Sequence, residues 1–105
     1  MRFIETTSFT KRITTILADD DYRKLQDALA LRPEAGPVIS GSGGIRKVRW
    51  ARPGSGKRGG IRVIYFWAPD EQVVYLLLVF PKNVQDDLTA EQLGLLRRAV
   101  REEFK

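Results

Sequence analysis

Residues 61–80 read IRVIYFWAPDEQVVYLLLVF, and this stretch decides the fold. The first part, Ile61 to Trp67, is rich in β-branched and aromatic residues and predicts a strand. The second part, Val73 to Phe80, is a continuous apolar run typical of a strand covered on both faces. Residues 68–71 contain Pro-Asp, which favours a hairpin connection between the two. We therefore expect two adjacent antiparallel strands inside a small sheet.

Outward from this hairpin, the pattern predicts an α+β fold in the order β-α-α-β-β-β-α. Residues 45–51 alternate as a third strand of the meander, and residues 2–5 form a short strand whose place in the sheet stays open. Residues 9–17 and 22–29 have helical periodicity, with Thr7 or Ser8 and Asp19 or Asp20 as expected caps, and form a helical hairpin on one side of the sheet. A capping-box pair, Thr89 and Gln92, precedes a C-terminal helix.

The composition bounds the possible chemistry. The 105 residues allow one domain, spanning 1–105. The chain has no cysteine and no histidine, which excludes thiol nucleophiles, cysteine–zinc sites and Ser-His or Cys-His catalysis. Any chemistry must therefore use Lys, Arg, Tyr, Asp, Glu or a bound partner. The longest apolar run is too short to cross a membrane and the first residues do not resemble a signal peptide, so we expect a cytoplasmic protein with no membrane partner.

Positive charge is concentrated in one part of the chain. No acidic residue lies between Glu34 and Asp70, whereas seven of the eighteen basic residues do. Such runs are often solvated surface, but seven uncompensated cations on a short segment repel one another unless they meet an anion. We expect this segment to contact a polyanion. Its members are Arg46, Lys47, Arg49, Arg52, Lys57, Arg58 and Arg62.

Two local patterns refine this expectation. Strand alternation places Lys47 and Arg49 side by side on one face, and Arg46 on the other. Residues 53–60 form a glycine-rich loop whose backbone can approach a phosphate, although it lacks the spacing of a Walker A motif. The aromatic residues on the strands are core positions more often than stacking platforms. They are Trp50, Tyr65 and Trp67.

Three strings carry a resemblance to a known family. They are GIRKVR at 44–49, GKRGGIRVIY at 56–65, and FPKN at 80–83 followed by Asp87-Leu88. Together with the order of elements, they make the chain resemble the RelE/HigB superfamily of bacterial toxins, and within it the HigB-like subgroup. The likeness covers nearly the whole chain, and the middle string is the most specific.

The resemblance implies a ribosome-dependent endoribonuclease that cuts mRNA in the A site and inhibits translation. In such toxins a ribose 2′-OH attacks the adjacent phosphate without a metal, so the resemblance implies no metal and no cofactor. The resemblance also implies a cognate antitoxin, expected to be a helix-turn-helix protein. Operator DNA is expected as a partner only through the toxin–antitoxin complex.

Carried over residue by residue, the resemblance and the charge pattern name two groups of side chains. Arg62, supported by Arg58, suits stabilisation of a phosphorane, because arginine binds two phosphate oxygens and keeps its proton. Lys57 or Lys82 could act as base or acid, and the sequence does not assign which. The catalytic candidates are Lys57, Arg58, Arg62 and Lys82. The candidates for RNA binding are Arg46, Lys47, Arg49, Arg52 and Phe80, the last by stacking on a base.

The related strings commonly have tyrosine where this chain has Phe80, which cannot donate a proton. This difference leaves the identity of the general acid open. Two other functions also remain as alternatives. One is a non-catalytic module that binds RNA or DNA, or an inactive family member. Another is a protein that acts only through its antitoxin complex. Cleavage of ribosome-bound mRNA distinguishes the first of these from a nuclease. Cell growth that stays unchanged after charge reversal in residues 46–62 would indicate a protein that acts only through its antitoxin complex.

Overall fold

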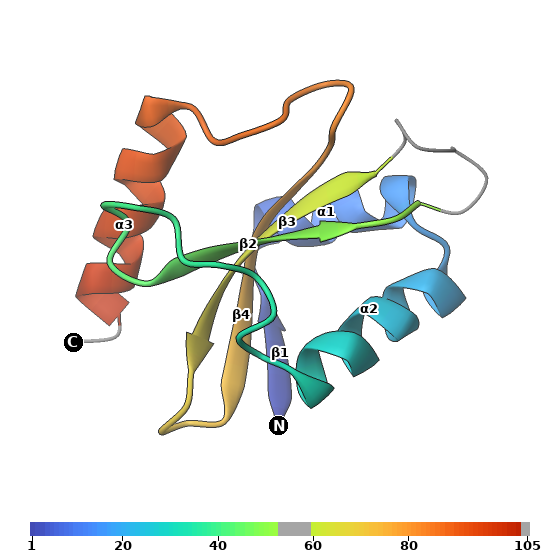
Figure 1. The fold of residues 1–105 in the computed structure, drawn as a ribbon, viewed down its shortest axis with the longest axis horizontal. Coiled ribbons are helices and arrows are strands. Elements are labelled where there is room, and N and C mark those ends of the chain that lie inside the picture. The colour runs from blue at the N-terminus through green and yellow to red at the C-terminus, as the bar shows by residue number, and fades with distance from the viewer. Residues whose placement is uncertain (53–59, 104–105) are drawn as a thin grey trace.

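The computed structural model describes residues 1–52 and 60–103. The elements follow one another in the expected order and confirm the α+β class (Figure 1). They are β1 (Arg2–Glu5), α1 (Thr7–Ile16), α2 (Asp19–Leu31), β2 (Ile45–Trp50), β3 (Ile61–Ala68), β4 (Val73–Pro81) and α3 (Ala90–Glu103).

The strands form one mixed sheet in the order β1-β4-β3-β2. β3 lies antiparallel to both β2 and β4, as the short connections predicted. β1 lies parallel to β4, with Phe3 opposite Val74, and this answers the question that the sequence left open. β4 therefore has a strand on each side and is covered on both faces, which explains why its residues are apolar without alternation.

Helices α1 and α2 cover one face of the sheet. Phe9 and Ile13 of α1 and Leu25 of α2 are buried against residues of β3 and β4 that point to this side. Trp50 and Trp67 pack at the margin of this cluster, and Tyr65 is wholly buried in it. The aromatic residues of the strands are thus core residues, as their alternation suggested.

The helix caps differ in part from the expected ones. Thr6, rather than Thr7 or Ser8, caps α1, because its side chain accepts the Phe9 N–H at 3.1 Å. α2 begins at Asp19 after Ala18, so the aspartates lie in its first turn, where the helix dipole favours them. The capping box before α3 is confirmed: Thr89 Oγ1 accepts the Gln92 N–H at 3.1 Å, and Gln92 Oε1 accepts the Thr89 N–H at 3.0 Å.

The opposite face of the sheet has two halves. α3 covers the apolar half, where Ile45, Ile64 and Phe80 pack with Val100 and Leu96 of the helix. Figure 1 shows α3 on the other side of the sheet from α1 and α2. The ionic half lies toward the end of β2 and the start of β3, and the connection between β4 and α3, residues 82–89, passes over it. This connection is called the acidic loop below.

A tight turn leads into β2 and fixes where that strand begins. Gly43 and Gly44 have φ angles of 78° and 109°, which side chains rarely adopt. The buried Ser42 hydroxyl accepts the Ile45 N–H at 2.9 Å. Arg97 of α3 donates to the Gly41 carbonyl at 3.1 Å, so the helix and the turn are joined directly.

In the described part of the chain, no helix is long and apolar enough to cross a membrane.

Candidate functional site

Three cations share the ionic half of the sheet face. In the strand register, Arg49 of β2 lies opposite Arg62 of β3, and Arg62 lies opposite Phe80 of β4. Lys47 lies two residues before Arg49 and therefore on the same face. The sequence predicted that Lys47 and Arg49 project together, and the register adds Arg62 to them. We call Lys47, Arg49 and Arg62 the cation row.

Arg62 is the most buried member of the row. Its side chain is only 6% exposed. Asp86 Oδ1 accepts from Nε at 3.1 Å and lies 2.9 Å from Nη2, while Nη1 reaches the Ile61 carbonyl at 3.4 Å. A charge this buried needs a partner, because desolvation otherwise costs several kcal/mol. The guanidinium is thus fixed in direction by an acid from the acidic loop.

Lys47 has a comparable partner from the same loop. Its Nζ lies 3.3 Å from Asp87 Oδ1, and that oxygen also accepts the Leu88 N–H at 2.8 Å. The Leu88 N–H, and then the charges of Lys47 and Arg49, lower the pKa of Asp87 below its ordinary value. Asp87 is therefore charged at neutral pH and faces two members of the cation row.

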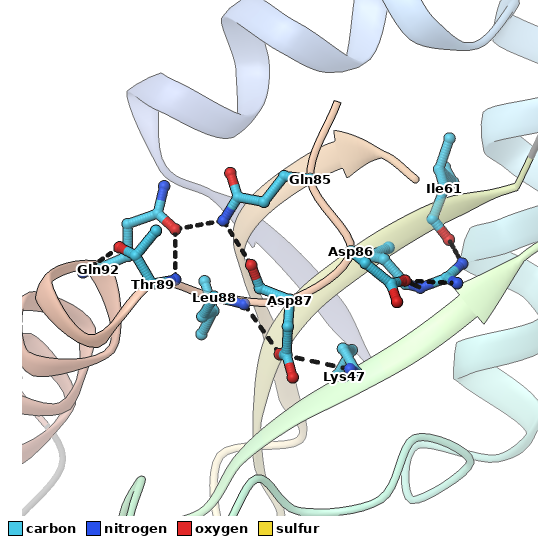
Figure 2. A network of polar contacts seen from close by, with 9 residues as sticks. Lys47, Ile61, Gln85, Asp86, Asp87, Leu88, Thr89 and Gln92 are labelled. Carbon is cyan, nitrogen blue, oxygen red and sulfur yellow. Dashed lines mark hydrogen bonds and ion pairs between the residues drawn. The ribbon is translucent and has the colours of Figure 1, made fainter. Parts of the chain in front are cut away.

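Side-chain amides hold the acidic loop in place. Gln85 Nε2 donates to the Asp87 carbonyl at 2.6 Å and to Gln92 Oε1 at 2.5 Å. Gln92 belongs to the capping box, so the loop is joined to the start of α3 (Figure 2). Figure 2 also shows Asp86 and Asp87 on the loop, with Asp87 directed at Lys47. The ionic half is thus covered by a loop that α3 helps to position.

The cation row borders two hollows beside β2. Gly36 makes the close approach of residues 33–37 possible, because a Cβ there would lie 2.7 Å from the Lys47 carbonyl oxygen. Lys47 lines both hollows, whose volumes are about 460 and 340 Å³. The larger is lined by Ala35, Gly36, Pro37, Lys47, Val48 and Arg49, and the smaller by Pro37, Val38, Ile39, Ser40, Lys47 and Asp87.

Arg46 does not join the cation row. As alternation predicted, it lies on the face of α1 and α2, where Nη1 donates to the Gly36 carbonyl at 2.8 Å. Its Nη2 lies 3.9 Å from the Glu34 carboxylate. Arg46 thus holds the connection between α2 and β2 against the sheet. Tyr65 of β3 also holds this connection, since its hydroxyl donates to the Pro33 carbonyl at 2.7 Å and accepts the Gly36 N–H at 2.9 Å.

Phe80 contradicts the expected role in base stacking. Its side chain is 1% exposed and belongs to the apolar half, in the cluster with Ile64 and Val100. The residue lies on the same face as Arg62, as the register requires, but the acidic loop and α3 cover this face. A ring enclosed in this way has no free side to offer a base, so we remove Phe80 from the proposed RNA contacts.

The other candidates are placed as follows. β4 continues through Pro81, and Lys82 lies exposed just after it, with its N–H donating to the Gly60 carbonyl at 2.9 Å. Lys82 is therefore next to the start of β3 and near Arg62 in the fold. Arg52 is half-buried just after β2. Lys57 and Arg58 lie outside the described residues.

Sequence reasoning missed Asp86 as a functional residue. The basic segment was expected to be uncompensated, whereas Lys47, Arg62 and Arg46 have acidic partners outside it. The only signal was the Asp-Asp pair after a strand end, and nothing in the sequence connects that pair to β2 and β3. In residues 1–52 and 60–103, no group of three or more acidic side chains could hold a metal ion.

The fold and the site together define a small α+β protein with a row of cations on one end of a sheet face, two of which, Lys47 and Arg62, are held by ion pairs. A comparison with protein families agrees with this description. The model of the RelE toxin of the RelE/RelB toxin–antitoxin system matches residues 3–104. The chain therefore belongs to the RelE toxin family. It is the toxin component of a toxin–antitoxin system, and its membership implies a cognate antitoxin as partner.

Proposed function

We propose that this toxin is a ribosome-dependent, metal-independent endoribonuclease of the HigB-like subgroup that cleaves mRNA in the ribosomal A site. The cation row carries this proposal. Arg62 is held on a rigid strand, and Lys47 and Arg49 lie beside it on the same face. We further propose that the protein acts in the cytoplasm and that its antitoxin is a helix-turn-helix protein. Operator DNA would be contacted through the complex of the two.

The proposed reaction needs a general base, a general acid and a group that stabilises the phosphorane. A base removes the proton of the 2′-OH, and the 2′-oxygen attacks the adjacent phosphorus. The bond from phosphorus to the 5′-oxygen breaks, and an acid protonates that oxygen as it leaves. The products are a 2′,3′-cyclic phosphate and a 5′-OH. The phosphorane gains negative charge along this path, and a guanidinium fork is suited to stabilise it.

The described residues support a division of roles. Arg62 would bind the reacting phosphate, and Lys47 and Arg49 would bind neighbouring phosphates along β2. Lys82, exposed beside Gly60, would act as acid or base. Lys57 and Arg58 complete the catalytic set by the family resemblance. The ribosome would orient the mRNA, and orientation alone can lower a barrier by about 7–11 kcal/mol.

Cleavage on programmed ribosomes tests this function. Purified toxin is added in excess to ribosomes with a defined A-site codon, and single-turnover products are resolved on a gel. We expect a cut in the A-site codon, a cyclic phosphate on the upstream fragment and no comparable cut in the same mRNA without ribosomes. Arg98→Ala, on the exposed side of α3, is the matched control and should cut at the rate of the unchanged protein.

A second candidate function has two observations in its favour. Arg62 is already occupied by Asp86, and Phe80 supplies no proton, as a non-catalytic RNA-binding module or an inactive family member would allow. The same assay separates the two. Toxin that binds programmed ribosomes and leaves the mRNA intact would contradict the nuclease and favour this alternative.

A further inference from the structure

In the ion pairs of the ionic half, the acidic side chains are far more exposed than the cations. The side chains of Asp86 and Asp87 are 65% and 66% exposed, whereas those of Arg62 and Lys47 are 6% and 18% exposed. The acids thus lie at the surface and the cations beneath them. A carboxylate that turns outward enters water at little cost, whereas a buried guanidinium without an anion is unfavourable. Any departure of these acids must therefore be matched by the arrival of another anion.

The two aspartates are not equally free to leave. Asp87 is tied to the loop backbone, because its carboxylate accepts the Leu88 N–H and its carbonyl accepts from Gln85. Asp86 contacts Arg62 through Oδ1 and has no other polar partner among the described residues. Rotation of the Asp86 side chain therefore breaks no backbone hydrogen bond of the acidic loop. Asp86 is the acid that an incoming anion can replace.

We propose that Asp86 is an internal counterion of Arg62 that RNA phosphate must displace, and that it thereby determines which RNA the toxin binds. This rests on the proposed function, since it places an RNA phosphate at Arg62. Asp86 Oδ1 uses Nε and Nη2 of the guanidinium, and these donors suit a phosphate equally well. Each exchange replaces one singly charged anion with another, so the buried cation stays neutralised.

A tethered carboxylate competes strongly with free RNA. An anion on a short tether has an effective concentration on the order of millimolar or more, so dilute RNA in solution displaces it poorly. RNA that the ribosome already holds against the site has a similarly high local concentration and can compete. Asp86 is therefore a specificity-determining residue that disfavours free RNA relative to ribosome-bound mRNA.

Binding of a short single-stranded RNA tests this role. A labelled 2′-O-methyl oligonucleotide, which cannot be cleaved, is titrated at several salt concentrations. Asp86→Asn keeps the shape of the side chain and removes its charge. We expect about tenfold tighter binding and a slope of log K against log salt steeper by roughly 0.7, as for one added phosphate contact to a single strand.

Asp70→Asn is the matched control. It changes the net charge equally, but Asp70 lies in the exposed turn after β3, about 20 Å along the strand from Arg62 at ~3.3 Å per residue. Its binding should stay within twofold of the unchanged protein. In an Arg62→Gln background, Asp86→Asn should give no more than the Asp70→Asn effect, because the donors for which Asp86 competes are gone.

Two results would overturn the proposal. One is Asp86→Asn protein that binds the oligonucleotide as the Asp70→Asn protein does, or more weakly. The other comes from unchanged protein with ¹³C-labelled aspartate: an Asp86 carboxyl resonance that does not move when the oligonucleotide saturates the site. The second result needs no variant to fold. If unchanged toxin does not cleave mRNA but the Asp86→Asn and Asp70→Asn proteins still differ in RNA binding, the proposed nuclease function alone is contradicted. If unchanged toxin cleaves mRNA and these two variants bind RNA equally, the counterion role of Asp86 alone is contradicted.

Discussion

The two halves of the sheet face beneath α3 and the acidic loop are covered by different forces. In the apolar half, side chains of β2, β3 and β4 lose contact with water against α3. In the ionic half, Lys47 and Arg62 pair with two exposed aspartates, and Arg49 lies beside them on the same face. The halves adjoin at the pair of Arg62 and Phe80, which lie opposite each other on β3 and β4.

The difference separates stability from function within one face. Burial of apolar surface has no competing partner in solution, so the apolar half stabilises the fold permanently. In the ionic half, the exposed carboxylate of Asp86 neutralises the buried Arg62, and another anion at the same donors can do so in its place. A site for a polyanion can therefore lie directly beside the core without weakening it. The predictions below test whether the border between the halves lies between Phe80 and Arg62.

The largest effect is expected for Phe80→Ala. Truncation of a buried phenylalanine removes apolar contacts and leaves a cavity, so the free energy of unfolding should fall by about 3–5 kcal/mol. Urea denaturation measures this loss. Val84→Ala, in the acidic loop and 74% exposed, is the control and should change stability by less than about 0.5 kcal/mol. A loss below about 1 kcal/mol for Phe80→Ala would show that this residue does not belong to the core.

Arg62→Ala should have the next largest effect, on activity. Removal of a donor that stabilises transition-state charge typically costs about 10²–10³ in rate. Single-turnover cleavage of A-site mRNA measures this loss, with circular dichroism to verify the fold. Arg62→Lys retains the charge and loses the fork, so it should recover only part of the rate. Cleavage by folded Arg62→Ala protein at the rate of unchanged toxin would exclude Arg62 from the reaction.

Local features of this molecule were predictable from the sequence, and contacts between distant segments were not. The hairpin of β3 and β4, the shared face of Lys47 and Arg49, and the box of Thr89 and Gln92 each follow from spacing within a few residues. The parallel position of β1 did not follow, since four residues carry no information on which strand they join.

The errors at the site have the same origin. Phe80 lies near the end of β4 beside proposed catalytic residues, and only the packing of α3 and the acidic loop shows that it is buried. The ion pairs of Lys47 and Arg62 join residues that are 40 and 24 positions apart in the chain. Charge counting along a segment therefore overestimated the free positive charge, because tertiary contacts bring in acids from outside that segment.

A smaller effect is expected for the two cations on β2. Lys47→Ala and Arg49→Ala each remove one phosphate contact, so each should lower the slope of log K against log salt by roughly 0.7–0.9 in ribosome binding. Arg46→Ala is the matched control on the same strand, because Arg46 lies on the opposite face. Its slope should remain that of unchanged toxin. Equal slopes for all four proteins would mean that the ionic half does not meet RNA.

The smallest effect is expected for Asp87→Asn, and it depends on pH. The Leu88 N–H and the nearby cations lower the pKa of Asp87 in the folded protein below its unfolded value of about 3.9. A carboxyl group of this kind stabilises the fold above the unfolded pKa, and the contribution is lost as pH falls through the lowered pKa. Because the side chain is largely exposed, the contribution should be below about 1 kcal/mol.

Urea denaturation of unchanged toxin and of the Asp87→Asn protein at several pH values checks the direction of this pH dependence. At about pH 7, Asp87→Asn protein should be slightly less stable than unchanged toxin, and the difference should shrink as pH falls below the unfolded pKa of about 3.9. Asp70→Asn is the control, since Asp70 is an exposed acid in the turn after β3, outside the acidic loop and outside any helix, and its stability should differ little from that of unchanged toxin at either pH. A difference for Asp87→Asn that persists unchanged at low pH would mean that the loss comes from altered loop packing rather than from the charge that faces Lys47.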